Sequence, residues 1–88
     1  MAQVEFQYKG ISTIIQCKED QKMIEIINIF ISKSNINENE INYYYNGKII
    51  SQNNKNLKFN EISNSFDKER KKIIILVINN IEKPINYL

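Results

Sequence analysis

The side chains of this sequence that could carry out chemistry are few, and the most reactive of them is Cys17. It is the only cysteine among the 88 residues, and the chain has no histidine that could act as its general base. The same two facts exclude a disulfide within the chain and a zinc site built from Cys and His. Cys17 falls in phase with Ile15 in a β-prone segment, which predicts a small buried hydrophobic residue. We therefore expect that the protein is not an enzyme.

The acidic residues form no pattern typical of a cofactor or metal site. Glu38 and Glu40 fall in a polar connection, where carboxylates are ordinarily solvated. The sequence contains no Gly-rich phosphate-binding motif and no spacing of metal ligands. We expect no cofactor, no metal and no small-molecule substrate.

The densest cluster of charge is the basic run KERKK at residues 68–72. Such a run can contact nucleic-acid phosphates or an acidic partner. Glu69 interrupts it, however, and Phe66 is the only nearby residue of a type that stacks on bases. The net charge of the whole chain is only +2, and its 42% of hydrophobic residues is ordinary for a globular protein. A solvated segment is the favoured interpretation, and nucleic acid is not an expected partner.

The sequence shows no pattern of secretion or membrane insertion. The N-terminus lacks the basic segment and apolar run of a signal peptide. The longest uninterrupted apolar stretch, residues 73–78, is too short to span a bilayer. A lone cysteine fits a reducing compartment, so we expect a cytoplasmic, intracellular protein without a membrane span.

The elements that would position these residues begin with a hairpin. Residues 4–8 alternate apolar and polar side chains, which predicts a half-buried strand. Lys9-Gly10 follows, and glycine supplies the backbone freedom that a tight turn needs. Residues 11–17 are again rich in β-forming types, so the two segments should pair.

A helix is expected next, from about residue 21 to 34. Its apolar stripe recurs at helical spacing and consists of Met23, Ile26, Ile27 and Phe30. Asp20 is the expected N-cap, and Asn35 can adopt the left-handed conformation that closes a helix. Ile29 lies outside the stripe and is either an exposed residue, which is the favoured interpretation, or a contact residue.

The segment EINYYYNGKII, residues 40–50, predicts a second hairpin. Asn46-Gly47 tolerates positive φ, and its turn matches the twist of paired strands, so residues 41–45 should pair with residues 48–50. An apolar patch near a short helical turn then contains Leu57, Phe59 and Ile62.

The last third of the chain alternates between charged and apolar character. Residues 64–72 are charged and expected to be solvated, whereas residues 73–78 form the most apolar and β-prone segment. That segment predicts a central strand, and residues 79–88 follow as a tail or linker in which Pro84 cannot extend a sheet ladder.

In its order of elements the chain resembles ubiquitin and the ubiquitin-like domains over roughly residues 3 to 78. The most specific residues are YYYNGKII, followed by LKFNEI and IIILVI. The resemblance implies an α+β, ubiquitin-like β-grasp fold, with a mixed sheet of four to five strands packed on one main helix. Residues 1–78 would form the ubiquitin-like domain, and residues 79–88 the C-terminal tail or linker.

The chain departs from the conjugated members of that family at its end. Their Gly-Gly tail is activated and transferred, whereas this chain ends in NNIEKPINYL and has no glycine after Gly47. We therefore expect a domain that is not conjugated. For the same reason the chain building of ubiquitin is not carried over to Lys48.

The resemblance implies a partner-binding patch on the exposed face of the sheet. Tyr44 matches the central patch residue of the family, and Leu76 matches the patch residue of the last strand. Alternation agrees, because Tyr43 and Tyr45 share one face with Ile41 and leave Tyr44 on the other. The competing interpretation is that Tyr44 is simply a β-forming residue on an outer face.

Alternation along the last strand places Ile74 outward with Leu76. The family's third patch position lies in the first hairpin turn, where Tyr8 or Lys9 is nearest. The residues expected to bind a partner are Tyr44, Leu76, Ile74, Tyr8 and Lys48. The function expected is a protein–protein interaction domain, an adaptor or targeting module that binds protein partners through its sheet face. The alternative is a small structural subunit or N-terminal domain of a larger assembly.

Overall fold

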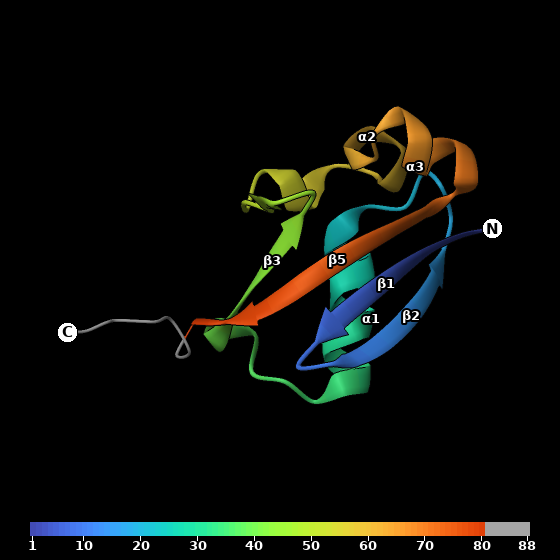
Figure 1. Ribbon diagram of the computed structural model, residues 1–88. Coiled ribbons are helices and arrows are strands. Elements are labelled where there is room, and N and C mark those ends of the chain that lie inside the picture. Colours follow the sequence, from blue (N-terminus) through green and yellow to red (C-terminus); the bar gives the residue numbers. More distant parts are fainter. Residues whose placement is uncertain (81–88) are drawn as a thin grey trace.

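The computed structural model, which describes residues 1–80, contains one five-stranded mixed sheet with helix α1 (Met23–Ser34) across one face (Figure 1). The strands lie in the order β2-β1-β5-β3-β4. Strands β1 and β5 are parallel, and the other neighbours are antiparallel. The bounds of the strands are β1 Ala2–Tyr8, β2 Ile11–Cys17, β3 Ile41–Tyr45, β4 Lys48–Ile49 and β5 Lys72–Asn79. The predicted α+β, β-grasp architecture and its central last strand are confirmed.

Both hairpins turn where the sequence predicts. Lys9 and Gly10 have φ of 50° and 80°, and Asn46 and Gly47 have φ of 52° and 78°. Two consecutive positive φ values are the mark of the type I′ turn, whose twist matches that of the strands it joins. Strand β5 reaches Asn79, one residue beyond the expected limit of the domain. Residues 81–88 of the expected tail lie outside the described residues.

Helix α1 begins later than expected and without the expected cap. Its N-cap residue is Lys22, whose side chain makes no capping bond, so the assignment of Asp20 is wrong. The orphan N–H of Met23 instead donates to the carbonyl of Leu57 at 2.8 Å. A backbone group from a distant segment thus replaces the side-chain cap. At the other end the prediction is confirmed, because Asn35 has φ of 55° and its N–H bonds to Ile31.

The hydrophobic core lies between α1 and the face of the sheet that we call the inner face. The rings of Phe6 and Phe30 stack with centroids 4.3 Å apart, and Tyr43 meets both edge-on. Ile29 is partly buried and packs against this core, so it is not the exposed residue that its place outside the stripe favoured.

The connection between β4 and β5 holds short helical segments: η2 (Asn54–Asn56), α2 (Phe59–Ile62) and α3 (Ser65–Arg70). A further turn, η1 (Glu38–Glu40), precedes β3. Phe59 is fully buried, as the apolar patch predicts. The charged segment 64–72 is not merely solvated, because Asp67 within it is only 6% exposed.

The carboxylate of Asp67 is buried because two neighbours satisfy it. The hydroxyl of Tyr45 donates to Asp67 Oδ2 at 2.6 Å, and Arg70 Nε donates to Oδ1 at 2.9 Å. The Asn64 N–H donates in turn to the Tyr45 hydroxyl at 3.0 Å. A buried carboxylate is tolerated when it is paired and hydrogen-bonded in this way. The contact fastens α3 to the end of β3.

Candidate partner-binding surface

The outer face of the sheet, which points away from α1, carries a row of large side chains across β5, β3 and β4. Tyr44 on β3 pairs with Leu76 on β5 and with Ile49 on β4. Ile74 lies two residues before Leu76 on the same face. We call Tyr44, Ile49, Ile74 and Leu76 the outer patch. The second hairpin, β3 and β4, and the much later strand β5 therefore build one surface.

The aliphatic residues of the outer patch are exposed to solvent, two of them on the central strand β5. Ile49, Ile74 and Leu76 are 49%, 37% and 47% exposed, and Tyr44 is half-buried between its neighbours. Ile78, two residues beyond Leu76, is also exposed. Single exposed apolar residues are ordinary, but a contiguous group of them marks an interaction surface.

Polar side chains of β1 and β2 border the outer patch on one side. Glu5, which pairs with Ile74, accepts hydrogen bonds from Gln7 at 3.0 Å and Ser12 at 2.9 Å. Lys72 lies 3.4 Å from the same carboxylate. The bonds from Gln7 and Ser12, with the charge of Lys72, hold the pKa of Glu5 below its usual value. An apolar centre with an ordered polar border is the usual anatomy of a protein interface.

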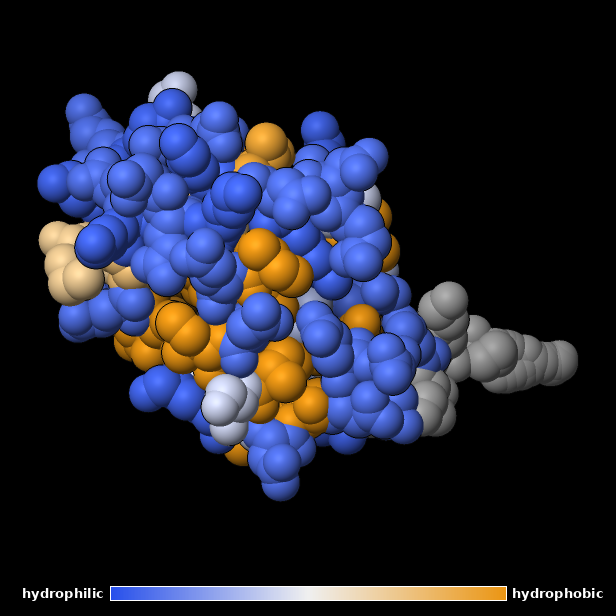
Figure 2. Space-filling view, turned by 180° about the vertical axis from the view of Figure 1, so that it is seen from behind, coloured by the Kyte–Doolittle hydropathy of each residue, from blue (hydrophilic) through white to orange (hydrophobic). Residues whose placement is uncertain are grey.

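The opposite side of the molecule offers a contrast (Figure 2). Hydrophilic residues cover most of it, and apolar side chains show only as an interrupted band among them. The partly buried apolar residues outside the main core include Ile29, Ile31 and Ile36, and all three pack against the core.

The structure brings together three of the five residues expected to bind a partner: Tyr44, Ile74 and Leu76. It places Tyr8 and Lys48 elsewhere. Tyr8 pairs with the buried Val77 and packs against the core, and its hydroxyl lies 3.4 Å from Asn79 Nδ2. Lys48 pairs with the buried Tyr45, which puts it on the inner side of the second hairpin.

Ile49 is the patch residue that sequence reasoning missed. A two-residue turn at Asn46-Gly47 pairs Tyr45 with Lys48, and the next pair away from the turn is Tyr44 with Ile49. The signal was therefore present in the sequence, because the turn type fixes the register of the hairpin.

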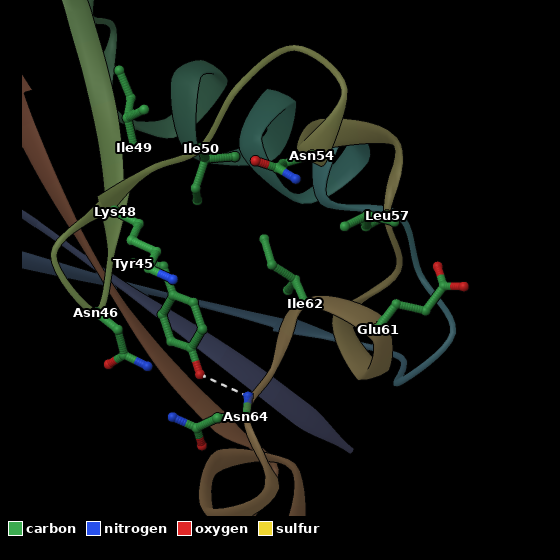
Figure 3. Close-up of a pocket in the computed structure, with 10 residues that line it drawn as sticks. All are labelled: Tyr45, Asn46, Lys48, Ile49, Ile50, Asn54, Leu57, Glu61, Ile62 and Asn64. Atoms are coloured by element: carbon green, nitrogen blue, oxygen red, sulfur yellow. Dashed lines mark hydrogen bonds between the residues drawn. The ribbon is translucent and has the colours of Figure 1, made fainter.

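A groove of about 380 Å³ lies on the inner side of the second hairpin, between that hairpin and α2 (Figure 3). Ile50, Leu57 and Ile62 point toward one another across it, and Lys48 and Tyr45 line the hairpin side. The bond between the Tyr45 hydroxyl and the Asn64 N–H closes its lower end in this view. Ile49 lies at the rim, so the groove and the outer patch adjoin at the β4 edge.

Among residues 1–80 the cysteine is buried, and the acidic side chains form no cluster that could bind a metal ion. Cys17 is 1% exposed, and burial raises the pKa of its thiol to about 11. The prediction of a small buried residue is confirmed. In the described part of the chain no group of three or more His, Cys, Asp and Glu side chains could hold a metal ion. None of the helices there is long and apolar enough to cross a membrane.

Neither a family model nor a curated protein matches this sequence. Solved structures do match it, at low identity. The UBL domain of yeast Ddi1 aligns with a TM-score of 0.71 and 16% identity, over 94% of this chain and 93% of that chain. The ubiquitin-like domain of the Arabidopsis thaliana protein At2g32350 aligns with a TM-score of 0.70 and 10% identity, over 98% and 84%.

A third similar structure is ATBAG1 in complex with HSP70, with a TM-score of 0.67 and 12% identity. The match covers 91% of this chain but only 41% of that chain, so this sequence spans less than half of it. At these identities the likeness is one of fold. It confirms the predicted resemblance to ubiquitin-like domains at that level.

Proposed function

We propose that this chain is a ubiquitin-like protein-interaction domain that binds partner proteins through the outer patch. In this proposal it works in the cytoplasm as an adaptor or targeting module and is not itself conjugated. The observation that carries the proposal is the contiguity of Tyr44, Ile49, Ile74 and Leu76 on one exposed face.

The energetics favour recognition by such a surface. Covering exposed apolar area stabilises a complex by about 25 cal/mol per Å² removed from water. Tyr44 adds an aromatic ring with a polar tip, a combination that is enriched among the residues dominating interface energies. The outer patch also sits on strands held by the core beneath, so little ordering is needed when a partner binds.

The similar folds are consistent with a binding role. ATBAG1, which contains a region of this fold, has been solved in complex with another protein, HSP70. That observation concerns ATBAG1. For this chain it supports only the general proposal that the partner is a protein, and it does not identify that protein.

The test removes the outer patch without disturbing the core. The double variant Tyr44→Ala/Leu76→Ala should remain folded and lose the capture of partner proteins from a cell lysate. Phe66→Ala is the matched control, because Phe66 is an aromatic residue that is 69% exposed on α3. It should capture the same proteins as the wild type. Unchanged capture by a folded double variant would show that the outer patch is the wrong surface.

A second candidate function is a structural subunit or N-terminal domain of a larger assembly. It is favoured by exposed apolar residues outside the outer patch, notably Phe66 and Ile11 at 69% each. Ile29 does not add to this argument, because it packs against the core. The candidate predicts purification with other chains at a fixed stoichiometry, and partners that exchange freely would contradict it.

A further inference from the structure

The two edges of the sheet are protected very differently. Strand β4 at one edge has only two residues, one of which is Lys48. Short length and an edge lysine both commonly block unwanted strand pairing. Strand β2 at the other edge has seven residues, ISTIIQC, without charge or proline. It pairs with β1 residue for residue, so no bulge interrupts it, and it forms one margin of the sheet (Figure 1). A long, uncharged edge strand is a template for another strand.

The register identifies which groups of β2 face that free edge. Tyr8 and Ile11 flank the first turn and form a hydrogen-bonded pair, after which bonded and non-bonded pairs alternate. An independent bond agrees with this pattern, because the N–H of Gln3 donates to the carbonyl of Lys71 at 3.0 Å, on the β5 side. That N–H therefore does not bond to Gln16, the residue that pairs with Gln3 on β2. The residues of β2 whose N–H and C=O groups point outward are therefore Ser12, Ile14 and Gln16.

We infer that β2 is a self-association edge, at which two copies of this chain pair antiparallel about a two-fold axis at Ile14. Ile14 is the central residue of the strand, and its backbone groups point outward. The axis sets Ile14 opposite its own copy and Ser12 opposite Gln16 of the second copy. Each of these three edge residues then exchanges both backbone bonds, which satisfies the whole exposed ladder.

The side chains favour a second copy as the occupant. Ile14 is 50% exposed on the outer face and would be covered by its own counterpart. Ile11 is 69% exposed and would lie opposite Cys17 of the second copy, beside its Ile15. Ser12 and Gln16, which would lie opposite each other, are exposed and uncharged, so no like charges meet along the paired strands.

The pairing makes one continuous ten-stranded sheet from two copies of the five-stranded sheet. Because the axis stands perpendicular to the sheet, both outer faces point the same way. Two outer patches would then be offered on one side, and a partner with two binding segments would gain avidity from them. The self-association itself does not depend on the proposed function.

Disulfide trapping in the full chain tests the pairing and its register together. Hydrogen-bonded antiparallel partners have Cα atoms about 5.5 Å apart, which is within the range of a disulfide. Under mild oxidation Ile14→Cys should form a covalent dimer. Gln16→Cys is the matched control on the same strand and face, and it should stay monomeric because it lies opposite Ser12 of the second copy. Native Cys17 can remain, since its buried thiol is slow to react.

The result that overturns the inference is an Ile14→Cys variant that dimerises no faster than Gln16→Cys. Sedimentation of the unmodified chain provides a second measure, in which the wild type should show a concentration-dependent dimer. Ile14→Lys should abolish it by setting like charges together, whereas Ile78→Lys, an equally drastic change away from the edge, should leave it intact. A wild type that is monomeric throughout would show that β2 does not pair with itself, whatever other strand it accepts.

Discussion

The two faces of the sheet are made by the same strands from similar residues, yet only one of them is covered. In β5, Ile73, Ile75 and Val77 are at most 3% exposed, whereas Ile74 and Leu76 between them are 37% and 47% exposed. Helix α1 covers one face and nothing among residues 1–80 covers the outer patch. Composition therefore does not distinguish the buried face from the exposed one. The alternation of side chains along each strand, and the face on which α1 packs, make the difference.

The largest difference between the faces should appear when neighbouring isoleucines are truncated. Ile75→Ala removes a fully buried side chain and should lower the free energy of unfolding by about 2–5 kcal/mol. Ile74→Ala, on the same strand, should lower it by less than about 1 kcal/mol. Chemical denaturation of the two variants measures both values. Equal losses would contradict the division between the faces.

A second pair of variants compares two tyrosines that face inward from β3. Tyr45→Phe removes the donor to Asp67 and the acceptor for the Asn64 N–H, and should cost about 1–3 kcal/mol. Tyr43 is more deeply buried, but its hydroxyl has no hydrogen-bond partner among residues 1–80. Tyr43→Phe should therefore leave the free energy of unfolding unchanged or slightly higher. A loss for Tyr43→Phe as large as that for Tyr45→Phe would contradict this assignment.

The inner face should also make stability sensitive to alkali. Burial raises the pKa of Tyr43 above its usual value and that of the Cys17 thiol to about 11. As the pH rises, these groups therefore lose their protons in the unfolded chain before they do so in the folded one. Their contribution to the free energy of unfolding is fully present below about pH 9 and is lost as the pH rises through 10 and 11. Thermal unfolding across this range should show a shallower fall for Tyr43→Phe than for the wild type. Parallel curves would count against burial as the cause.

Much of this contrast could be predicted from the sequence. The period-two pattern of residues 41–45 and 73–78 assigned Tyr43, Ile75 and Val77 to the core and Tyr44 and Leu76 to the outside, and the exposed fractions agree. Both hairpins followed from their turn residues. These features are local, so the sequence alone carries them.

The errors at Asp20 and Asp67 share a physical cause, which is that tertiary partners replaced local ones. Asp20 failed as a cap because the carbonyl of Leu57 receives the first N–H of α1. Asp67 lies buried in a charged segment because Tyr45, 22 residues earlier, supplies its hydroxyl. No periodicity within either segment could show such contacts.

Site-specific photo-crosslinking in cells tests the proposal that the outer patch contacts a protein partner. A photoreactive residue would replace Gln7, which borders the outer patch opposite Leu76, or Phe66 on α3 as the control. We expect discrete protein adducts from position 7, none of them shared with position 66, and their loss in the Tyr44→Ala/Leu76→Ala background. Adducts that persist in that background, or their absence at position 7, would contradict it.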